Sequence, residues 1–484
     1  MKKIAFVCFL LCCLFLYSEE EIVVIDSALA DYDGKKITLS GNVVVEHKLG
    51  TISADQVILT ETPQLVKNLY GMIHMQGNVC VALKEGGKIT CAQADVDYNK
   101  RSAVFSGTPE QESVVYTESL HSQGEMGIAL VVKGRRMSMQ LLKRNPGDSP
   151  KNAIESISIE ESVTVNYNHD LIAFADSAHY QHEEGSENQR LPGTIVLKAA
   201  KQGGGCQLTN RQGDVVRSNE MQIDTLKRYL TFASPRGSIE AEFGRMEFTA
   251  DSLLWDEHNQ ALTLEGNVEV VQQDTGTIKT PHQIRIEHVV ENGHKQPHII
   301  YSPSQTHLTY RDQTNHPRTI FCPGPVQIDH QKKQGTLTGI LDQQIAFEDS
   351  RGEIFADKAF LVYQGSGKGI VPEKIFLEGN VRILNHLTPD NQKTTAALHY
   401  VLADELEYTP ANEEMLFKSN GARRVLFFDK VNNMQVSAPG LKLYRDQISG
   451  KDSIQGIGDV RFSFVELEFE QLKQKFSLLQ SSQG

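Results

Sequence analysis

The sequence predicts an all-β protein built of short antiparallel strands stacked as a repeat. Apolar and polar residues alternate with a period of two, which is typical of strands with one buried face. A five-residue phrase, an apolar residue and any residue followed by Gly-Asn-Val, recurs along the chain. Helical spacing of apolar residues is confined to 464–479, which predicts either a C-terminal cap or an irregular tail.

The Gly-Asn-Val phrase marks a repeated bend. Full copies lie at Leu39–Val43, Met75–Val79, Leu264–Val268 and Leu377–Val381, with weaker echoes at Ile159–Val163 and Ile457–Val460. Glycine before asparagine suits a position that needs positive φ. Each copy therefore predicts a kink or β-bulge inside a strand.

A second phrase, Ala-Asp followed by alternating apolar residues, also recurs. Its copies begin at Ala54, Ala94, Ala175, Ala250, Ala356 and Ala403. We expect each aspartate to lie at a strand corner, where a short carboxylate can accept hydrogen bonds from nearby backbone N–H groups. Because these carboxylates recur at one point of the repeat, they predict a structural corner and not a pair of acid–base catalysts.

The N-terminus has the layout of a secretory signal peptide. Lys2 and Lys3 precede an apolar run, Ile4–Tyr17, and three glutamates follow Ser18. The run is short for a membrane span. We expect cleavage after Ser18 and a periplasmic mature protein, associated at most with the outer membrane. The alternatives are an anchor that stays attached and a lipoprotein acylated at Cys12 or Cys13.

Polar stretches and stretches rich in proline or glycine indicate approximate boundaries in the remaining chain. The predicted organisation is a signal peptide over 1–18, repeat segments over 19–145, 151–292 and 305–465, and a tail over 466–484.

Enzyme, metal and nucleic-acid signals are weak. The formal net charge of −13 disfavours a nucleic-acid partner. No Gly-x-Ser-x-Gly elbow or P-loop is present, and His179 and His182 lie in strand-like sequence. Four cysteines follow the signal without Cys-x-x-Cys spacing, so we expect no zinc and no cofactor. Cys80 and Cys91 flank a turn, and they are either a cross-strand disulfide or two unpaired strand residues.

Taken together, the Gly-Asn-Val and Ala-Asp phrases between 28 and 408 resemble the OstA-like domain shared by LptA, LptC and the periplasmic part of LptD. The resemblance implies an elongated β-jellyroll, here in two or more tandem segments, that binds the acyl chains of lipopolysaccharide in an apolar slot. It also implies transport toward the outer membrane and end-to-end partners, other jellyroll proteins of the transport bridge, through edge strands. The length of this chain departs from LptA. It lacks the long series of barrel strands expected of LptD.

Alternation places a set of apolar side chains on the inward strand faces, and these are the candidate lipid wall. Plain core packing is the alternative for each of them, and it goes with a structural or adhesive envelope protein without lipid cargo. A carbohydrate-active β-solenoid enzyme is a third alternative. The candidate residues are Val43, Val45, Val57, Leu59, Val79, Val81, Leu253, Trp255, Val268, Val270, Val381, Ile383, Leu406 and Tyr408.

Overall fold

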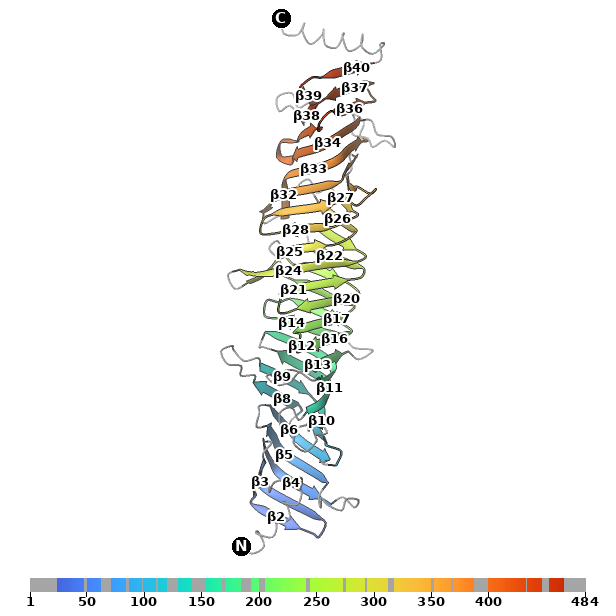
Figure 1. Ribbon diagram of the computed structural model, residues 1–484. Helices are drawn as coiled ribbons and strands as arrows, with labels where there is room; N and C mark the ends of the chain where they lie inside the picture. Colours follow the sequence, from blue (N-terminus) through green and yellow to red (C-terminus); the bar gives the residue numbers. More distant parts are fainter. Residues whose placement is uncertain are drawn as a thin grey trace. The chain divides into compact units, whose positions relative to one another are not determined.

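The computed structural model describes most of the chain between residues 24 and 464 (Figure 1). The described ranges are 24–47, 50–61, 71–83, 87–97, 99–109, 112–119, 129–141, 154–167, 170–183, 193–199, 205–240, 244–272, 276–291, 294–311, 317–349, 352–366, 369–386, 399–431, 433–445 and 452–464. The chain forms two compact units. Unit 1 comprises residues up to 237 together with 254–257, and unit 2 comprises 238–253 and the residues from 258 onward.

Short strands dominate the described residues. Up to residue 239 they are β1 (Val24–Asp26), β2 (Leu29–Tyr32), β3 (Lys36–His47), β4 (Gly50–Thr60), β5 (Met72–Leu83), β6 (Lys88–Asp97), β7 (Ser102–Ser106), β8 (Val114–Ser119), β9 (Ala129–Gly134), β10 (Arg136–Leu141), β11 (Ile154–Tyr167), β12 (Leu171–His182), β13 (Gly193–Lys198), β14 (Cys206–Asn210), β15 (Val215–Ser218), β16 (Glu220–Asp224), β17 (Tyr229–Ala233) and β18 (Arg236–Ile239).

The strands after residue 239 are mostly shorter, apart from β33 and β34. They are β19 (Met246–Thr249), β20 (Ser252–Asp256), β21 (Ala261–Glu265), β22 (Val268–Gln272), β23 (Gly276–Thr280), β24 (Gln283–Glu291), β25 (His294–Ser302), β26 (Thr306–Arg311), β27 (Pro317–Cys322), β28 (Val326–Asp329), β29 (Gln334–Thr338), β30 (Ile345–Glu348), β31 (Gly352–Ala356), β32 (Lys358–Ser366), β33 (Gly369–Asn385), β34 (His399–Thr409), β35 (Glu414–Lys418), β36 (Val425–Asp429), β37 (Met434–Ala438), β38 (Gly440–Arg445), β39 (Asp452–Ile457) and β40 (Arg461–Phe464).

Unit 1 has two antiparallel layers that share several long strands. Each long strand bends once, so that one half pairs in the first layer and the other half in the second. In β3 the half before the bend pairs with β2 and the half after it pairs with β1. In β11 the half 154–160 pairs with β10, and the half 163–167 pairs with β9. The inward faces of the two layers enclose the core.

Unit 2 repeats the same arrangement with shorter strands. One layer contains β21, β24, β25, β28, β29 and β32, each paired antiparallel with the next. The other contains β19, β22, β23, β26, β27, β30 and β31. The long strand β33 bends and pairs with both β32 and β31. Strands of one layer therefore follow one another in chain order through this unit (Figure 1).

The bends occur at the Gly-Asn phrase, inside β3, β5 and β33 as predicted, whereas Gly266 and Asn267 lie between β21 and β22 and not inside a strand. Both residues of each phrase have positive φ, for example 81° at Gly379 and 45° at Asn380. The ladder skips both residues where β33 pairs with β34, between Glu378 and Val381. The same two-residue bulge interrupts β3 and β5. The Gly-Asn dipeptide therefore adopts the backbone conformation with which the chain passes from one layer to the other.

The all-β, antiparallel prediction is confirmed. Among the described residues, helical structure is a three-residue 3-10 turn, η2 (Pro410–Asn412), and no helix there is long and apolar enough to cross a membrane. The predicted signal peptide (1–18) and tail (466–484) lie outside the described residues. The division into three repeat segments stays a prediction.

The open question about Cys80 and Cys91 is settled by the strand register. Cys91 pairs with Val79, whereas Cys80 pairs with Thr90 on the neighbouring ladder position. Because successive residues of a strand face opposite sides, the two sulfur atoms point to opposite faces of the sheet. Both thiols are free, and burial raises the pKa of Cys91 to about 12, so this thiol is unreactive.

Candidate functional site

An aspartate from an earlier bend holds three of the four Gly-Asn bends, those at Asn78, Asn267 and Asn380. The Asn267 amide donates to the Asp251 carboxylate at 2.8 Å, and the backbone N–H of Asp251 donates to the carbonyls of Glu265 and Gly266. Asn78 bonds Asp55 in the same way at 3.0 Å, and Asn380 bonds Asp357 at 2.8 Å. The recurrent Ala-Asp phrase thus supplies the partner of the recurrent Gly-Asn phrase.

We call the Asp–Asn hydrogen bond at a bend the clamp. It differs from the predicted role of the aspartates, and it explains why glycine precedes each clamped asparagine. The aspartates were expected to bind backbone N–H groups, but Asp55, Asp251 and Asp357 bind asparagine side chains. A backbone N–H does reach Asp404, from Asn420 at 2.7 Å. A Cβ atom at Gly379 would lie 2.4 Å from the Asp357 carboxylate, so a side chain has no room there. The carboxylate row is a structural corner, with its oxygens engaged in holding the fold.

The fourteen candidate lipid-wall residues all lie in strands. Ten are buried and four are half-buried, and the half-buried ones are Val45, Val81, Ile383 and Tyr408. Val44 and Cys80 are less buried than Val43 and Val79, the candidates that precede them, which agrees with two-faced strands. The structure therefore places the candidates on the inward faces. Burial alone leaves both the lipid-wall reading and the core-packing reading open.

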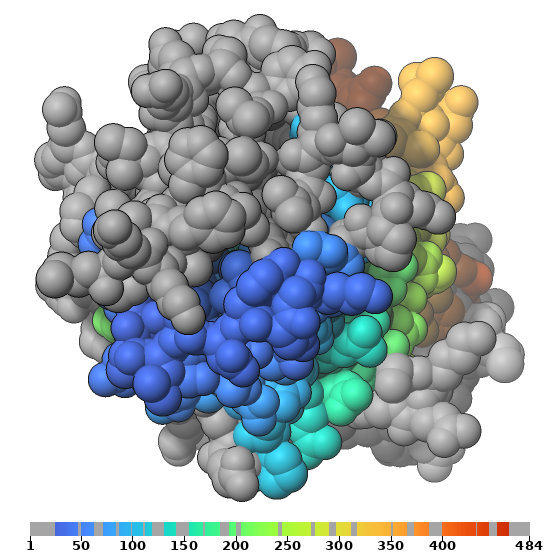
Figure 2. All heavy atoms as spheres, turned by 90° about the horizontal axis from the view of Figure 1, so that it is seen from below, coloured from blue at the N-terminus to red at the C-terminus, as the bar shows by residue number. Residues whose placement is uncertain are grey.

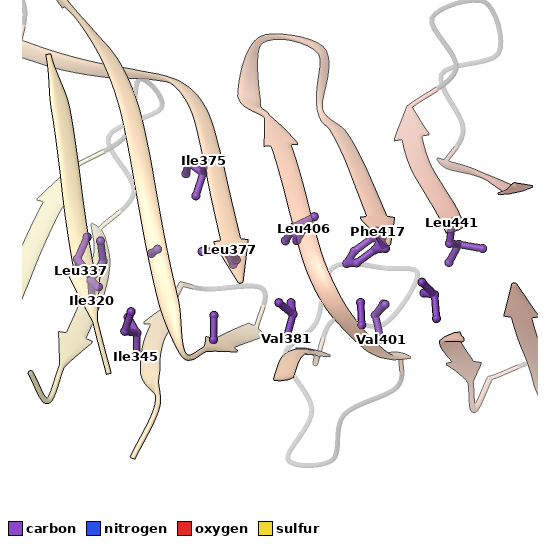
Figure 3. Close-up of a cluster of buried hydrophobic side chains, with 14 of the residues drawn as sticks. Ile320, Leu337, Ile345, Ile375, Leu377, Val381, Val401, Leu406, Phe417 and Leu441 are labelled. Atoms are coloured by element: carbon purple, nitrogen blue, oxygen red, sulfur yellow. The ribbon is translucent and has the colours of Figure 1, made fainter. Parts of the chain in front are cut away.

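In unit 2 several of these candidates belong to a contiguous core. Val381 and Leu406 pack in a cluster of buried side chains that includes Ile320, Leu337 and Phe417, drawn in Figure 3. Ile383 and Tyr408 pack against its edge. Figure 3 shows the labelled side chains following one another from strand to strand between the layers. In this part of unit 2, buried side chains of successive strands pack against one another.

Unit 1 contains an apolar cavity of about 50 Å³ between its two layers. Ile157 and Ile159 line it from the first half of β11, and Val165 lines it from the second half. The cavity therefore lies inside the bend of β11. The described residues that line it are Tyr116, Leu130, Val132, Ile157, Ile159, Val165, Ala178, Tyr180, Ile195 and Thr225.

A buried carboxylate lies on the same strand as Tyr116, one of the residues that line this cavity. Glu118 is 4% exposed and faces inward, two residues beyond Tyr116 on β8 and opposite Leu130 of β9. The Tyr116 hydroxyl donates to its carboxylate at 2.5 Å. Burial, and then the negative charge of Glu118, raise the pKa values of Tyr116 and Tyr180 well above their usual value. Both phenols are therefore held as neutral hydrogen-bond donors at ordinary pH.

None of the fourteen candidate residues lines the cavity. Two sequence features do mark this region. Ile159–Val163 is a weaker copy of the Gly-Asn-Val phrase, and Tyr180 ends the Ala-Asp copy that begins at Ala175. The buried Glu118 gave no such signal, since a glutamate in an alternating strand is normally assigned to the solvent face. Glu118 is inward because it shares one face of β8 with the buried Val114 and Tyr116, at a spacing of two residues.

Metal ligands do not cluster in the part of the chain that the structure describes. His179 Nδ1 lies 2.8 Å from the Ser158 hydroxyl, and His182 Nδ1 lies 3.5 Å from the Tyr180 hydroxyl, so each histidine has a strand neighbour. The feature that stands out in the described interior is thus the apolar cavity.

No protein-family model matches this chain, and no curated protein matches it. Among solved structures, it is similar to the extracellular domain of a one-component system from B. thetaiotaomicron. That similarity has 7% sequence identity and a TM-score of 0.10, and it covers 93% of this chain and 97% of that chain. A likeness this weak carries no argument about fold or function.

Proposed function

We propose that this protein is a lipopolysaccharide carrier of the periplasm, and not an enzyme, which holds acyl chains between the layers of unit 1. The observation that carries the proposal is the apolar cavity inside the bend of β11. The likeness of the Gly-Asn-Val and Ala-Asp phrases to the OstA-like domain supports lipopolysaccharide as the cargo. Passage of this cargo toward the outer membrane is part of the same proposal.

The size of the cavity sets a condition on binding. Its volume of about 50 Å³ is smaller than the roughly 150 Å³ of an engineered protein cavity that holds benzene. An acyl chain therefore enters only if the two layers move apart. The side chains that face the cavity are mainly aliphatic, and apolar contacts are non-directional, so they can be exchanged for contacts with a chain. Each buried methylene then contributes about 0.8 kcal/mol.

The N-terminal strands of unit 1 support a partner of the same architecture. Among the described strands, β1 and β2 pair with β3 alone, so their other edges pair with no described strand. This end of the unit is seen in Figure 2. Leu29 and Tyr32 on β2 are 71% and 53% exposed. Another jellyroll protein of the transport bridge would add a strand here by β-augmentation.

A structural envelope protein is the second candidate function, and the packed core of unit 2 favours it. Buried side chains from Ile320 to Leu441 pack against one another there. If the whole interior behaves like this region, the repeat serves as a spacer or adhesive scaffold without cargo. The two candidates differ in whether lipid reaches the interior of unit 1.

Photo-crosslinking at paired positions on one strand tests the carrier function. A photoreactive phenylalanine analogue replaces Ile159, which lines the cavity, and in a control it replaces Ser158, which faces outward. After irradiation with purified lipopolysaccharide, we expect adducts at position 159 and few at position 158. A third variant at Leu377, in the core of unit 2, should remain unlabelled.

Equal labelling at positions 158 and 159 would show surface association and would contradict the carrier function. Circular dichroism establishes that each variant keeps its strands. Binding of radiolabelled lipopolysaccharide to the unmodified chain provides a measurement free of substitutions. Binding that does not saturate, or that detergent does not compete away, would favour the structural scaffold.

A further inference from the structure

The C-terminal end of unit 2 exposes apolar side chains that face inward. Phe462 of β40 pairs with Val436 of β37, which is part of the buried core. Ile454 of β39 pairs with Leu443 of β38, which packs against that core. Side chains directly opposite each other in an antiparallel ladder lie on the same face, so Phe462 and Ile454 both face inward. Phe462 is nevertheless 57% exposed and Ile454 is 40% exposed, whereas Val436 is 1% exposed.

The exposure follows from the place of these strands at the end of the stack (Figure 1). Among the described strands, β39 pairs with β38 alone and β40 pairs with β37 alone. The preceding strand β38, in contrast, lies between β35 and β39. This end therefore combines inward-facing apolar side chains with two strand edges that pair with no described strand. Such a surface invites association with another chain unless it is covered.

The chain continues beyond this end with the sequence pattern of an amphipathic helix. Residues 465–484 follow β40. Within them, apolar residues are spaced alternately four and three residues apart, which places them on one stripe of a helix. Glutamates come first and lysines follow, an order that suits the helix dipole. The stripe consists of Val465, Phe469, Leu472, Phe476 and Leu479.

We propose that residues 465–479 form an amphipathic helix that closes the C-terminal end of the unit 2 core over Phe462 and Ile454. A helix of this length spans about 20 Å, which is about twice the roughly 10 Å between two packed sheets, so it reaches the edges of both layers. The segment starts directly after β40, the strand that carries Phe462, so it reaches this surface without a long connection.

The cover has a consequence for assembly. A helix over the edges of β39 and β40 keeps a second copy of the chain from adding a strand at this end. The inference concerns unit 2, and it does not depend on acyl-chain binding in unit 1.

Photo-crosslinking in the full chain tests where residues 465–479 lie. A photoreactive phenylalanine analogue replaces Ile454, and in a matched variant it replaces Leu402 of β34. Leu402 is 38% exposed between the buried Val401 and Ala403, so it faces outward. After irradiation and digestion, mass spectrometry should find position 454 joined to a peptide from 465–484 of the same chain. Position 402 should give few such adducts.

The possible occupants of this end give different products. Adducts from position 454 that join two chains would show that a second copy covers the end, and they would overturn the proposal. Equal yields from positions 454 and 402 would mean that the segment binds apolar surface without selection, which also overturns it. An absence of adducts with 465–484 has the same meaning.

A pair of substitutions measures the contribution of the apolar stripe. Leu472→Asp places a charge within the stripe, and Gln474→Asp places the same charge on the opposite face of the helix. We expect amide exchange of β37 and β40 to become at least about tenfold faster in Leu472→Asp, because full burial of a leucine side chain is worth more than that factor. In Gln474→Asp it should change by less than about twofold.

Sedimentation velocity then measures the consequence for assembly. Leu472→Asp should self-associate at concentrations at which Gln474→Asp remains a monomer. Equal exchange rates in the two variants would overturn the placement of the helix. Faster exchange without self-association would overturn its role in keeping a second copy away.

Discussion

Two bends in this molecule perform the same task with different residues. In β33 of unit 2, Gly379 and Asn380 turn the strand, and Asp357 from the preceding bend accepts a hydrogen bond from Asn380. In β11 of unit 1, Glu161 and Ser162 occupy the equivalent positions with φ of 65° and 56°. The backbone shape is thus common to both bends, whereas the side chains that hold it differ.

At the β11 bend, Arg135 takes the place that Asp357 has at the β33 bend. The backbone N–H of Arg135 donates to the carbonyls of Glu160 and Glu161, as that of Asp357 does to Glu378 and Gly379. The Arg135 guanidinium lies 3.6 Å from the Glu161 carboxylate, so a side-chain ion pair replaces the Asp–Asn bond. The comparison teaches that the backbone bonds define the bend, and that the side-chain clamp is an addition whose strength depends on its burial.

The β33 bend also has a wider network. Gln344 donates to the Asp357 carboxylate at 2.8 Å and accepts from Arg382 at 2.7 Å. The guanidinium of Arg382 lies 4.9 Å from the centre of the Phe355 ring. In contrast, Arg135 and Glu161 are both more than half exposed. We therefore expect the β33 bend to resist local opening more strongly than the β11 bend.

The largest effect is expected from Gly379→Ala. The new Cβ meets the Asp357 carboxylate at 2.4 Å, and the residue must keep a left-handed φ, so the variant should lose about 2–4 kcal/mol. Amide hydrogen exchange of β33 and β34 measures this loss locally. Ser162→Ala is the matched control in β11 and should change exchange there by less than about 0.5 kcal/mol. Equal losses at both bends would remove the distinction drawn between them.

The next effect is expected from Asp357→Ala. The change removes the acceptor of the Asn380 and Gln344 amides, which should cost about 1–2 kcal/mol in the exchange of the same strands. It also removes the two carboxyl atoms that a Cβ at position 379 would approach within 2.4 and 2.9 Å, while the Cβ of residue 357 at 2.8 Å remains. Gly379→Ala should therefore cost less in this background than alone, and strict additivity of the two changes would argue against the clamp.

Glu161→Gly should make the β11 bend more stable. Glycine adopts a left-handed φ without the penalty of a Cβ atom, so we expect a gain of about 1 kcal/mol. The gain appears as slower amide exchange in β11 and β12. Glu160→Gly is the comparison. Glu160 is paired in the ladder and does not have a left-handed φ, so glycine at this position should destabilise the strand. A loss at both positions would contradict our account of the bend.

The smallest effect is expected from Arg135→Ala. Both partners of its ion pair are exposed, so the loss should be at most about 0.5 kcal/mol and should vanish in high salt. Amide exchange of β11 at low and high salt measures it. An effect as large as that of Asp357→Ala would mean that an exposed ion pair can replace the Asp–Asn clamp in full.

Much of the fold could be predicted from the sequence because its information is local. The alternation in Val43–Val45 and in Val57–Leu59 predicts inward faces, and those side chains are inward. The Gly-Asn dipeptide predicts a bend through its backbone preference alone. The expectation for the aspartates was less accurate, because a carboxylate near a corner can bind any of several donors, and the stacking of strands selects the asparagine amide.

By itself, the sequence determined that this chain forms two-faced strands and where many of them bend, since both properties depend on residues adjacent in the chain. Only the tertiary structure decided which aspartate binds which asparagine and why Cys80 and Cys91 face opposite sides of the sheet. It also decided where a cavity remains and that Glu118 is buried. These outcomes depend on the register between strands and on how the side-chain volumes of two layers fit together, and neither quantity is encoded within a single strand.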